Sequence, residues 1–228
     1  MRRIAALALL AGACACIGAP AWCGSGGRSR DLRPVANPSE VIATELAFAR
    51  LAQEKGQWAA FREYADKDAQ MFVPQPVEAN NWLKSQEEPA QAVTWQPHAV
   101  WSSCDGEYAI TEGAWQRPSG TGWFSTVWKR QRNGEYKWVL DQGGNGDAPI
   151  PAGEFIKAEV GSCENKDAIT APTLSVPTGD TKMIYGESTD KTLRWITRVE
   201  ADGSRYYAFE YWDGQQMQRP IAENVPAE

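Results

Sequence analysis

Apolar residues recur at helical spacing after Asn37 and give way to strand-like alternation at Val93. The helical pattern predicts a first helix that begins at Pro38, with Asn37 placed to cap it, and that ends before Gly56. Its spacing indicates one apolar face directed toward a core. The residues on that face are Val41, Ile42, Leu46, Phe48, Ala49 and Ala52.

Two shorter helices are predicted after the first. The second is indicated by the spacing of Trp58, Phe61, Ala65 and Ala69. A proline-containing break follows over 72–76, and a third short helix is predicted over 79–85.

Long alternating segments then predict an antiparallel meander. Asp105-Gly106 and Asn133-Gly134 are hairpin-turn pairs, because both residue types tolerate positive φ. Helices followed by a run of strands indicate an α+β domain with a four-stranded antiparallel sheet. The four predicted strands are 93–103, 107–117, 122–132 and 135–142.

The rest of the chain predicts a β-rich extension. A Gly-rich stretch and two prolines mark the boundary near residue 146, and the segment 218–228 is predicted to be frayed. The strands predicted in this extension are 154–163, 182–187, 191–200 and 205–212.

The first 37 residues have the pattern of a targeting segment and a tether. Arg2 and Arg3 precede a short apolar run and an A-x-A site, which is typical of a cleaved signal peptide. Ala11 to Cys14 also resembles a lipobox, which leaves lipid anchoring in the envelope as an alternative. The predicted division is a signal peptide over 1–21, a flexible tether over 22–37, the α+β domain over 38–146 and the extension over 147–228.

Composition excludes several classes of function. The 228 residues carry a net charge of −6 and no basic run, which disfavours binding to nucleic acid. His98 is the single histidine, so His-rich metal sites are excluded, and no metal or cofactor is predicted. The one apolar run, near the N-terminus, is too short to span a bilayer.

Cysteine usage fits an oxidising compartment. Cys23, Cys104 and Cys163 remain after the signal, and the preferred pairing is Cys104 with Cys163, which would tie the main domain to the extension. The alternative is a pair of buried free thiols.

Several stretches of the α+β segment resemble the nuclear transport factor two-like superfamily, in its SnoaL-like branch of exported bacterial domains of unknown function. The resemblance covers about half of the chain and implies a cone-shaped fold, in which the helices pack on a curved four-stranded sheet with a pocket between them. It implies isomerase, cyclase, hydrolase or pure binding roles, and dimerisation through the sheet. The stretches that carry it are Glu45–Arg50, Gly56–Phe61, Tyr64–Asp68, Thr111–Trp115, Thr126–Lys129 and Trp138–Asp141.

Turn chemistry predicts which residues share the pocket face. The two Asx-Gly turns, with Arg117 opposite Gly122 across the middle turn, define a register for the four strands. A one-residue slip at that middle turn would put Glu112 on the face instead. In the predicted register one row contains His98, Gly113, Thr126 and Asp141.

The helices are expected to cover this row and enclose an apolar pocket. Its predicted walls are Phe61, Tyr64 and Met71 from the helices, and Gly113, Trp115, Phe124 and Thr126 from the sheet.

Two titratable residues of the row are candidates for chemistry. His98 titrates near neutral pH and would act as general acid or base, with Asp141 orienting it or holding a ligand. The structural alternatives are a half-buried strand histidine and an aspartate bonded to the glycine-rich turn. Asp66 and Asp68 are further carboxylates expected near the pocket mouth, with a solvated helix end as the alternative.

The sequence therefore predicts an exported domain that binds a small, partly apolar molecule or a protein partner. The alternative is a cofactor-free isomerase, cyclase or hydrolase that uses His98 and a carboxylate. A third interpretation is an interaction protein that forms homodimers through its sheet.

Overall fold

The computed structural model of the protein describes residues 35–172 and 179–227. The predicted signal peptide, the lipobox with Cys14 and Cys16, most of the tether and Cys23 lie outside the described residues. The described residues belong to one compact unit.

Three helices occur where the sequence pattern placed helices. Helix α1 spans Pro38–Lys55, and Gly56 ends it in a left-handed conformation (φ 108°) that favours glycine. The Asn37 side chain makes no capping hydrogen bond; its backbone carbonyl accepts from the Glu40 N–H instead. Helix α2 spans Gln57–Tyr64 and helix α3 spans Ala79–Lys84.

The second helix is shorter than the sequence pattern predicted. Residues Ala65–Phe72 form strand β1, which pairs in parallel with β6 (Tyr136–Gly146) and antiparallel with the short β2 (Pro76–Glu78). Ala69 and Met71 are buried on alternate positions of β1. Their two-residue spacing fits a strand, and the wrong prediction came from assigning Ala65 and Ala69 a helical period.

The main sheet is larger than the predicted meander. It has seven strands in the order β2-β1-β6-β5-β4-β3-β7, where the meander is its central part. Strand β7 adds to β3 in parallel, so part of the predicted extension belongs to this sheet. The remaining strands are β3 (Thr94–Ser102), β4 (Tyr108–Arg117), β5 (Gly120–Arg130) and β7 (Lys157–Val160).

A second sheet follows in the chain. It contains four antiparallel strands in the order β11-β10-β9-β8. Residues 218–228 were predicted to be frayed, but most of them form the edge strand β11, which pairs with β10 along its length. The strands are β8 (Lys182–Glu187), β9 (Leu193–Val199), β10 (Arg205–Trp212) and β11 (Met217–Val225).

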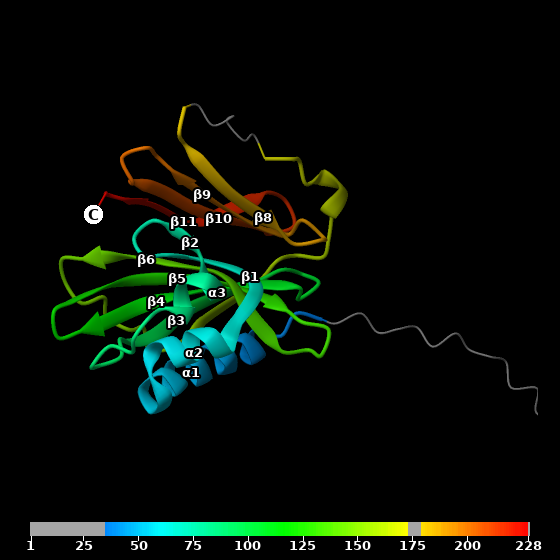
Figure 1. Ribbon diagram of the computed structural model, residues 1–228. Helices are drawn as coiled ribbons and strands as arrows, with labels where there is room; N and C mark the ends of the chain where they lie inside the picture. Colours follow the sequence, from blue (N-terminus) through cyan, green and yellow to red (C-terminus); the bar gives the residue numbers. More distant parts are fainter. Residues whose placement is uncertain (1–34, 173–178, 228) are drawn as a thin grey trace, which may run out of the picture. The chain divides into compact units, whose positions relative to one another are not determined.

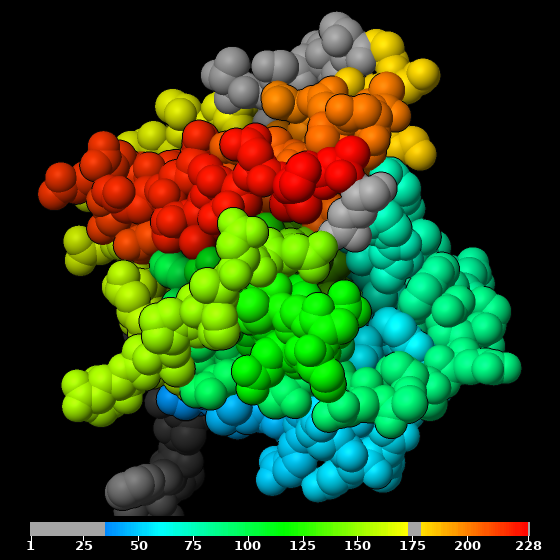
Figure 2. All heavy atoms as spheres, turned by 90° about the vertical axis from the view of Figure 1, so that its left-hand side faces the viewer, coloured from blue at the N-terminus to red at the C-terminus, as the bar shows by residue number. Residues whose placement is uncertain are grey.

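The elements form three layers, with the seven-stranded sheet in the middle (Figures 1 and 2). On its inner face, a core of α1, α2 and α3 residues packs against Val100, Trp128 and Trp138. On its outer face, Trp101 and Ile110 pack against the second sheet, including Phe209. The face predicted to form a homodimer is thus covered by the chain's own C-terminal strands, and a dimer through it would require their displacement.

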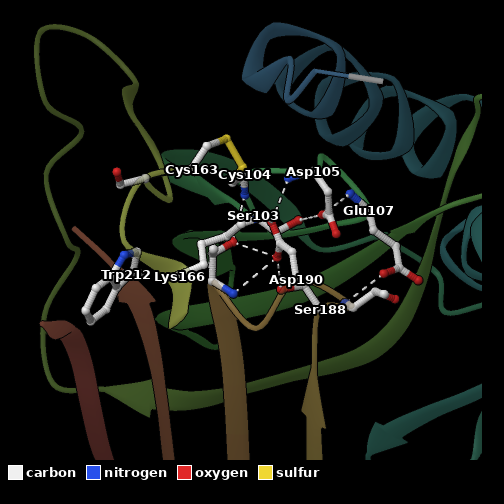
Figure 3. Close-up of polar contacts among 12 residues, drawn as sticks. Ser103, Cys104, Asp105, Glu107, Cys163, Lys166, Ser188, Asp190 and Trp212 are labelled. Atoms are coloured by element: carbon white, nitrogen blue, oxygen red, sulfur yellow. Dashed lines mark hydrogen bonds and ion pairs between the residues drawn. A yellow bond between two sulfur atoms is a disulfide. The ribbon is translucent and has the colours of Figure 1, made fainter. Parts of the chain in front are cut away.

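A cluster of turns fastens the second sheet to the first (Figure 3). Cys104, beside the β3–β4 turn, and Cys163, after β7, form the predicted disulfide, with Cα atoms 5.3 Å apart. The Cys104 N–H donates to Thr192 Oγ1 at 2.8 Å, and the Asp105 N–H donates to Asp190 Oδ2 at 3.0 Å. These bonds join segments 85 or more residues apart.

The interface between the two sheets also contains a carboxyl group. Glu112 of β4 is half-buried, and burial together with the charge of Glu223 raises its pKa to about 7. Nearby, the hydroxyls of Ser125 and Tyr207 are hydrogen-bonded at 2.8 Å. The native state therefore binds a proton at Glu112 more tightly than the unfolded chain does.

Ionisation of Glu112 is expected to lower the stability of the folded protein as pH rises. The contribution of Glu112 is fully present below its unfolded pKa and is lost as pH rises through about 7. Glu112→Gln should therefore leave stability at pH 4 nearly unchanged and raise it at pH 8 by about 3 kcal/mol. Urea unfolding at both pH values measures this difference.

The exposed Glu54→Gln is the matched control and should leave the pH dependence intact. An unchanged pH dependence in Glu112→Gln would show that Glu112 is ionised to the same extent in the folded and unfolded states.

Candidate functional site

A cavity lies between helices α1 and α2 and the inner face of the seven-stranded sheet. It has a volume of about 210 Å³. Because the rings come from both layers, the cavity has aromatic surfaces on opposite sides. The aromatic residues lining it are Phe48, Phe61, Phe72, Trp95, Trp115 and Phe124.

Charged groups are few in this lining. Among the described residues that line the cavity, Asp141 is the one acid and Arg117 the one base. Thr126, Gln57, Gln142 and Asn145 add uncharged polar groups. The wall thus combines aromatic rings with polar groups, which suits a small molecule that is itself partly apolar.

Asp141 is placed by its strand partner. It pairs with Thr126 across β5 and β6, and Thr126 Oγ1 donates to Asp141 Oδ2 at 2.8 Å. Within the described residues, Oδ1 of Asp141 makes no hydrogen bond. This oxygen is therefore available to a ligand in the cavity.

Burial raises the pKa of Asp141 to about 7, although its hydrogen bond from Thr126 lowers it. The charge of Glu45 raises the pKa further. Asp141 thus exchanges protons near neutral pH, which ordinary aspartates do not.

Glu45 is a second acid, and it lies behind the cavity wall. It is fully buried on α1 and accepts hydrogen bonds from Trp95 Nε1 at 2.7 Å, Thr111 Oγ1 at 2.6 Å and Trp128 Nε1 at 3.0 Å. Burial raises the pKa of Glu45 while these three bonds lower it. The bonds connect α1 to β3, β4 and β5, and they hold Trp95 as part of the cavity wall.

Glu45 was not predicted as a site residue. Its signal in the sequence is position: Val41, Glu45, Phe48 and Ala52 share the buried face of α1. An acid on an otherwise apolar face marks a buried carboxyl that needs donors.

The second sheet contacts the wall of the cavity through Arg205. This residue of β10 is buried, its guanidinium donates to the Gly143 carbonyl, and it lies 4.7 Å from the Phe72 ring centroid. Gly143 and Phe72 both line the cavity. The C-terminal strands therefore contribute to the shape of the site.

Some of the residues expected to line the pocket line this cavity, and others do not. Phe61, Trp115, Phe124, Thr126 and Asp141 line one cavity. Tyr64, Met71 and Gly113 do not line it. Tyr64 and Met71 pack into the inner core, and Gly113 is buried beside Phe124.

His98 lies apart from Asp141. The register slips between Pro97 and Ala99, so Pro97, not His98, pairs with Gly113. Proline lacks the N–H that a ladder requires, and strand prolines therefore occur at such bulges. His98 lines a different hollow, of about 160 Å³, beside Ala114.

The predicted row was also shifted at its middle strand. Arg117 pairs with Gly120 rather than Gly122, so Thr126 lies opposite Thr111 and not Gly113. The Thr126–Asp141 pair was predicted correctly.

Asp66 and Asp68 do not line the cavity; Asp66 accepts hydrogen bonds from the Asp68 N–H and from Gln131.

Over the described ranges, no group of three or more His, Cys, Asp or Glu residues is placed to hold a metal ion. No helix in the described part of the chain is long and apolar enough to cross a membrane.

No protein-family model matches the chain, and no curated protein matches its sequence. Solved structures are similar to it in part. A nuclear transport factor 2-like superfamily protein from Salmonella enterica serovar Typhimurium is 14% identical, with a TM-score of 0.38 over 51% of this chain and 95% of that one.

Two others are comparable. ActVI-ORFA from Streptomyces coelicolor is 10% identical, with a TM-score of 0.38 over 49% of this chain and 98% of its own. A protein from Catenulispora acidiphila, in complex with S-DNPA, is 11% identical, with a TM-score of 0.37 over 47% of this chain and 92% of its own. Each likeness covers about half of this chain, and none assigns it a ligand or an activity.

Proposed function

We propose that this protein is an exported binding protein that holds a small, partly apolar molecule in the cavity between α1, α2 and the large sheet. The observation that carries the proposal is the aromatic lining around one acceptor, Asp141, whose Oδ1 has no hydrogen bond within the described residues. An apolar ligand would contact the rings, and its polar atom would contact this oxygen.

The volume suits a small molecule. A cavity of about 150 Å³ accommodates a benzene ring. The 210 Å³ here accommodates one ring with substituents.

Export is supported by two independent features. The N-terminal pattern is that of a signal peptide, and the Cys104–Cys163 disulfide suits an oxidising compartment. Native mass spectrometry of the protein purified from its own envelope tests processing and retained ligand together.

The binding proposal predicts a pH-dependent affinity for a hydroxyl-bearing ring. With 4-methylphenol as the probe, binding measured by saturation-transfer NMR should strengthen as pH rises through about 7, because ionised Asp141 is the better acceptor. Asp141→Asn should remove the pH dependence while the protein stays folded.

Val93→Trp is the blocking variant, because Val93 lines the cavity and its backbone N–H bond to Gln57 would be kept. It should abolish probe binding. Equal binding by wild type and Val93→Trp would place the probe elsewhere and contradict the proposed site.

A second candidate function is favoured by the Asp141 carboxyl itself. A buried acid with a pKa of about 7 and an oxygen without a bond in the described residues suits a general base or acid. This version of the enzyme hypothesis uses Asp141 without His98, which lines another hollow. Deuterium uptake from D₂O into the copurified molecule, lost in Asp141→Asn, would favour it over binding alone.

A further inference from the structure

The two charged residues of the cavity, Arg117 of β4 and Asp141 of β6, lie on the two strands that flank β5, level with different positions along it. The Arg117 guanidinium lies over the Trp115 ring, 5.3 Å from its centroid. Trp115 in turn pairs with Gly122 of β5. Asp141 pairs with Thr126. Gly122 and Thr126 are four residues apart, which corresponds to about 13 Å along a strand.

The surface between these two points is apolar. Phe124 lies midway along β5 and faces the cavity, with Phe48 and Phe61 of the helices also in the lining. An aromatic ring of a ligand would therefore lie between a cationic end and an acidic end.

Arg117 has no acidic partner here. It is exposed at the end of β4, and no ion pair joins it to a carboxylate within the described residues. Its N–H donors make no hydrogen bond within the described residues, and the guanidinium fork matches the two oxygens of a carboxylate.

We propose that the ligand of this cavity is an aryl carboxylate with a polar group at the far end of its ring. Arg117 binds the carboxylate, and Asp141 hydrogen-bonds the opposite group. This inference rests on the proposed binding function and names its ligand class. A phenylpropanoate with a para hydroxyl has the required order of groups, and with a hydrogen bond at each end its length approaches about 13 Å.

The test compares 3-(4-hydroxyphenyl)propanoate with its neutral amide, by titration calorimetry at pH 7 and low salt. The acid is expected to bind at least about tenfold more tightly than the amide, because only the acid forms a charge-assisted pair. Arg117→Gln should remove this preference without affecting the fold, since the side chain is exposed.

Arg132→Gln is the control, because it removes the same charge from an exposed turn residue outside the cavity lining. It should keep the preference for the acid. Added salt should weaken binding of the acid and leave binding of the amide unchanged.

Equal binding of acid and amide to wild type, or an unchanged preference in Arg117→Gln, would overturn the ligand class while leaving the cavity as a binding site. Failure of both compounds to bind would also overturn the ligand class. The proposed binding function is tested separately with 4-methylphenol. It would be contradicted if wild type and Val93→Trp bound this probe equally or if neither bound it.

Discussion

Glu45→Ala is expected to destabilise the protein by about 3–5 kcal/mol, because it leaves a cavity and removes the acceptor shared by three buried donors. The donors are the indole N–H groups of Trp95 and Trp128 and the hydroxyl of Thr111. Trp128 also donates to Thr111 Oγ1 at 3.0 Å, so part of this network survives the substitution. Urea unfolding monitored by tryptophan fluorescence measures the loss.

Glu54→Ala is the matched control, since Glu54 is an exposed acid on the same helix. It should stay within about 0.5 kcal/mol of wild type. The stability of Glu45→Gln should lie between those of Glu45→Ala and Glu54→Ala. The amide keeps one acceptor oxygen but directs its own N–H groups toward the buried donors. A Glu45→Ala protein as stable as the control would mean that the three donors find other partners.

The features that the sequence predicted correctly are local ones. Helix α1 was predicted to the residue because Pro38 and Gly56 are local signals for a helix start and stop. Hairpins at Asx-Gly pairs were predicted for the same reason. Each of these features depends on residues next to one another in the chain.

Non-local features were missed. Strand β1 is stabilised by parallel pairing with β6, and Glu45 finds its three donors 50, 66 and 83 residues away. Asp141 was correctly paired with Thr126 through two offsetting shifts: Arg130 pairs with Tyr136, one residue off the register of the predicted two-residue turn, and the irregularity between Val127 and Trp128 restores the predicted register. His98 was misplaced because the bulge beside Pro97 shifts the register of β3, which the turn alone does not encode.

Removal of the disulfide is the other change with a large expected effect. Cys104 and Cys163 are separated by 59 residues, and closing a loop of that length constrains the unfolded chain. The double variant Cys104→Ser, Cys163→Ser is expected to lose about 3–4 kcal/mol of stability under non-reducing conditions. The midpoint of urea unfolding measures this loss.

Reductant separates the disulfide from the substitution itself. Dithiothreitol should destabilise the wild-type protein by a similar amount and leave the double variant unchanged. Cys23→Ser controls for a cysteine outside the bond and should respond to reductant as wild type does. If reductant has no effect on the wild-type protein, the bond is absent from the purified chain.

Loss of the Cys104–Cys163 disulfide should also weaken ligand binding in the cavity. Cys163 precedes the second sheet, whose Arg205 donates to the Gly143 carbonyl and packs on Phe72 in the cavity wall. The disulfide and the hydrogen bonds of Thr192 and Asp190 hold that sheet on the outer face. The double variant should therefore bind 4-methylphenol more weakly than wild type even where both are folded, since the sheet that positions Arg205 is held by fewer constraints. Unchanged affinity would show that the docking of the second sheet is independent of the disulfide.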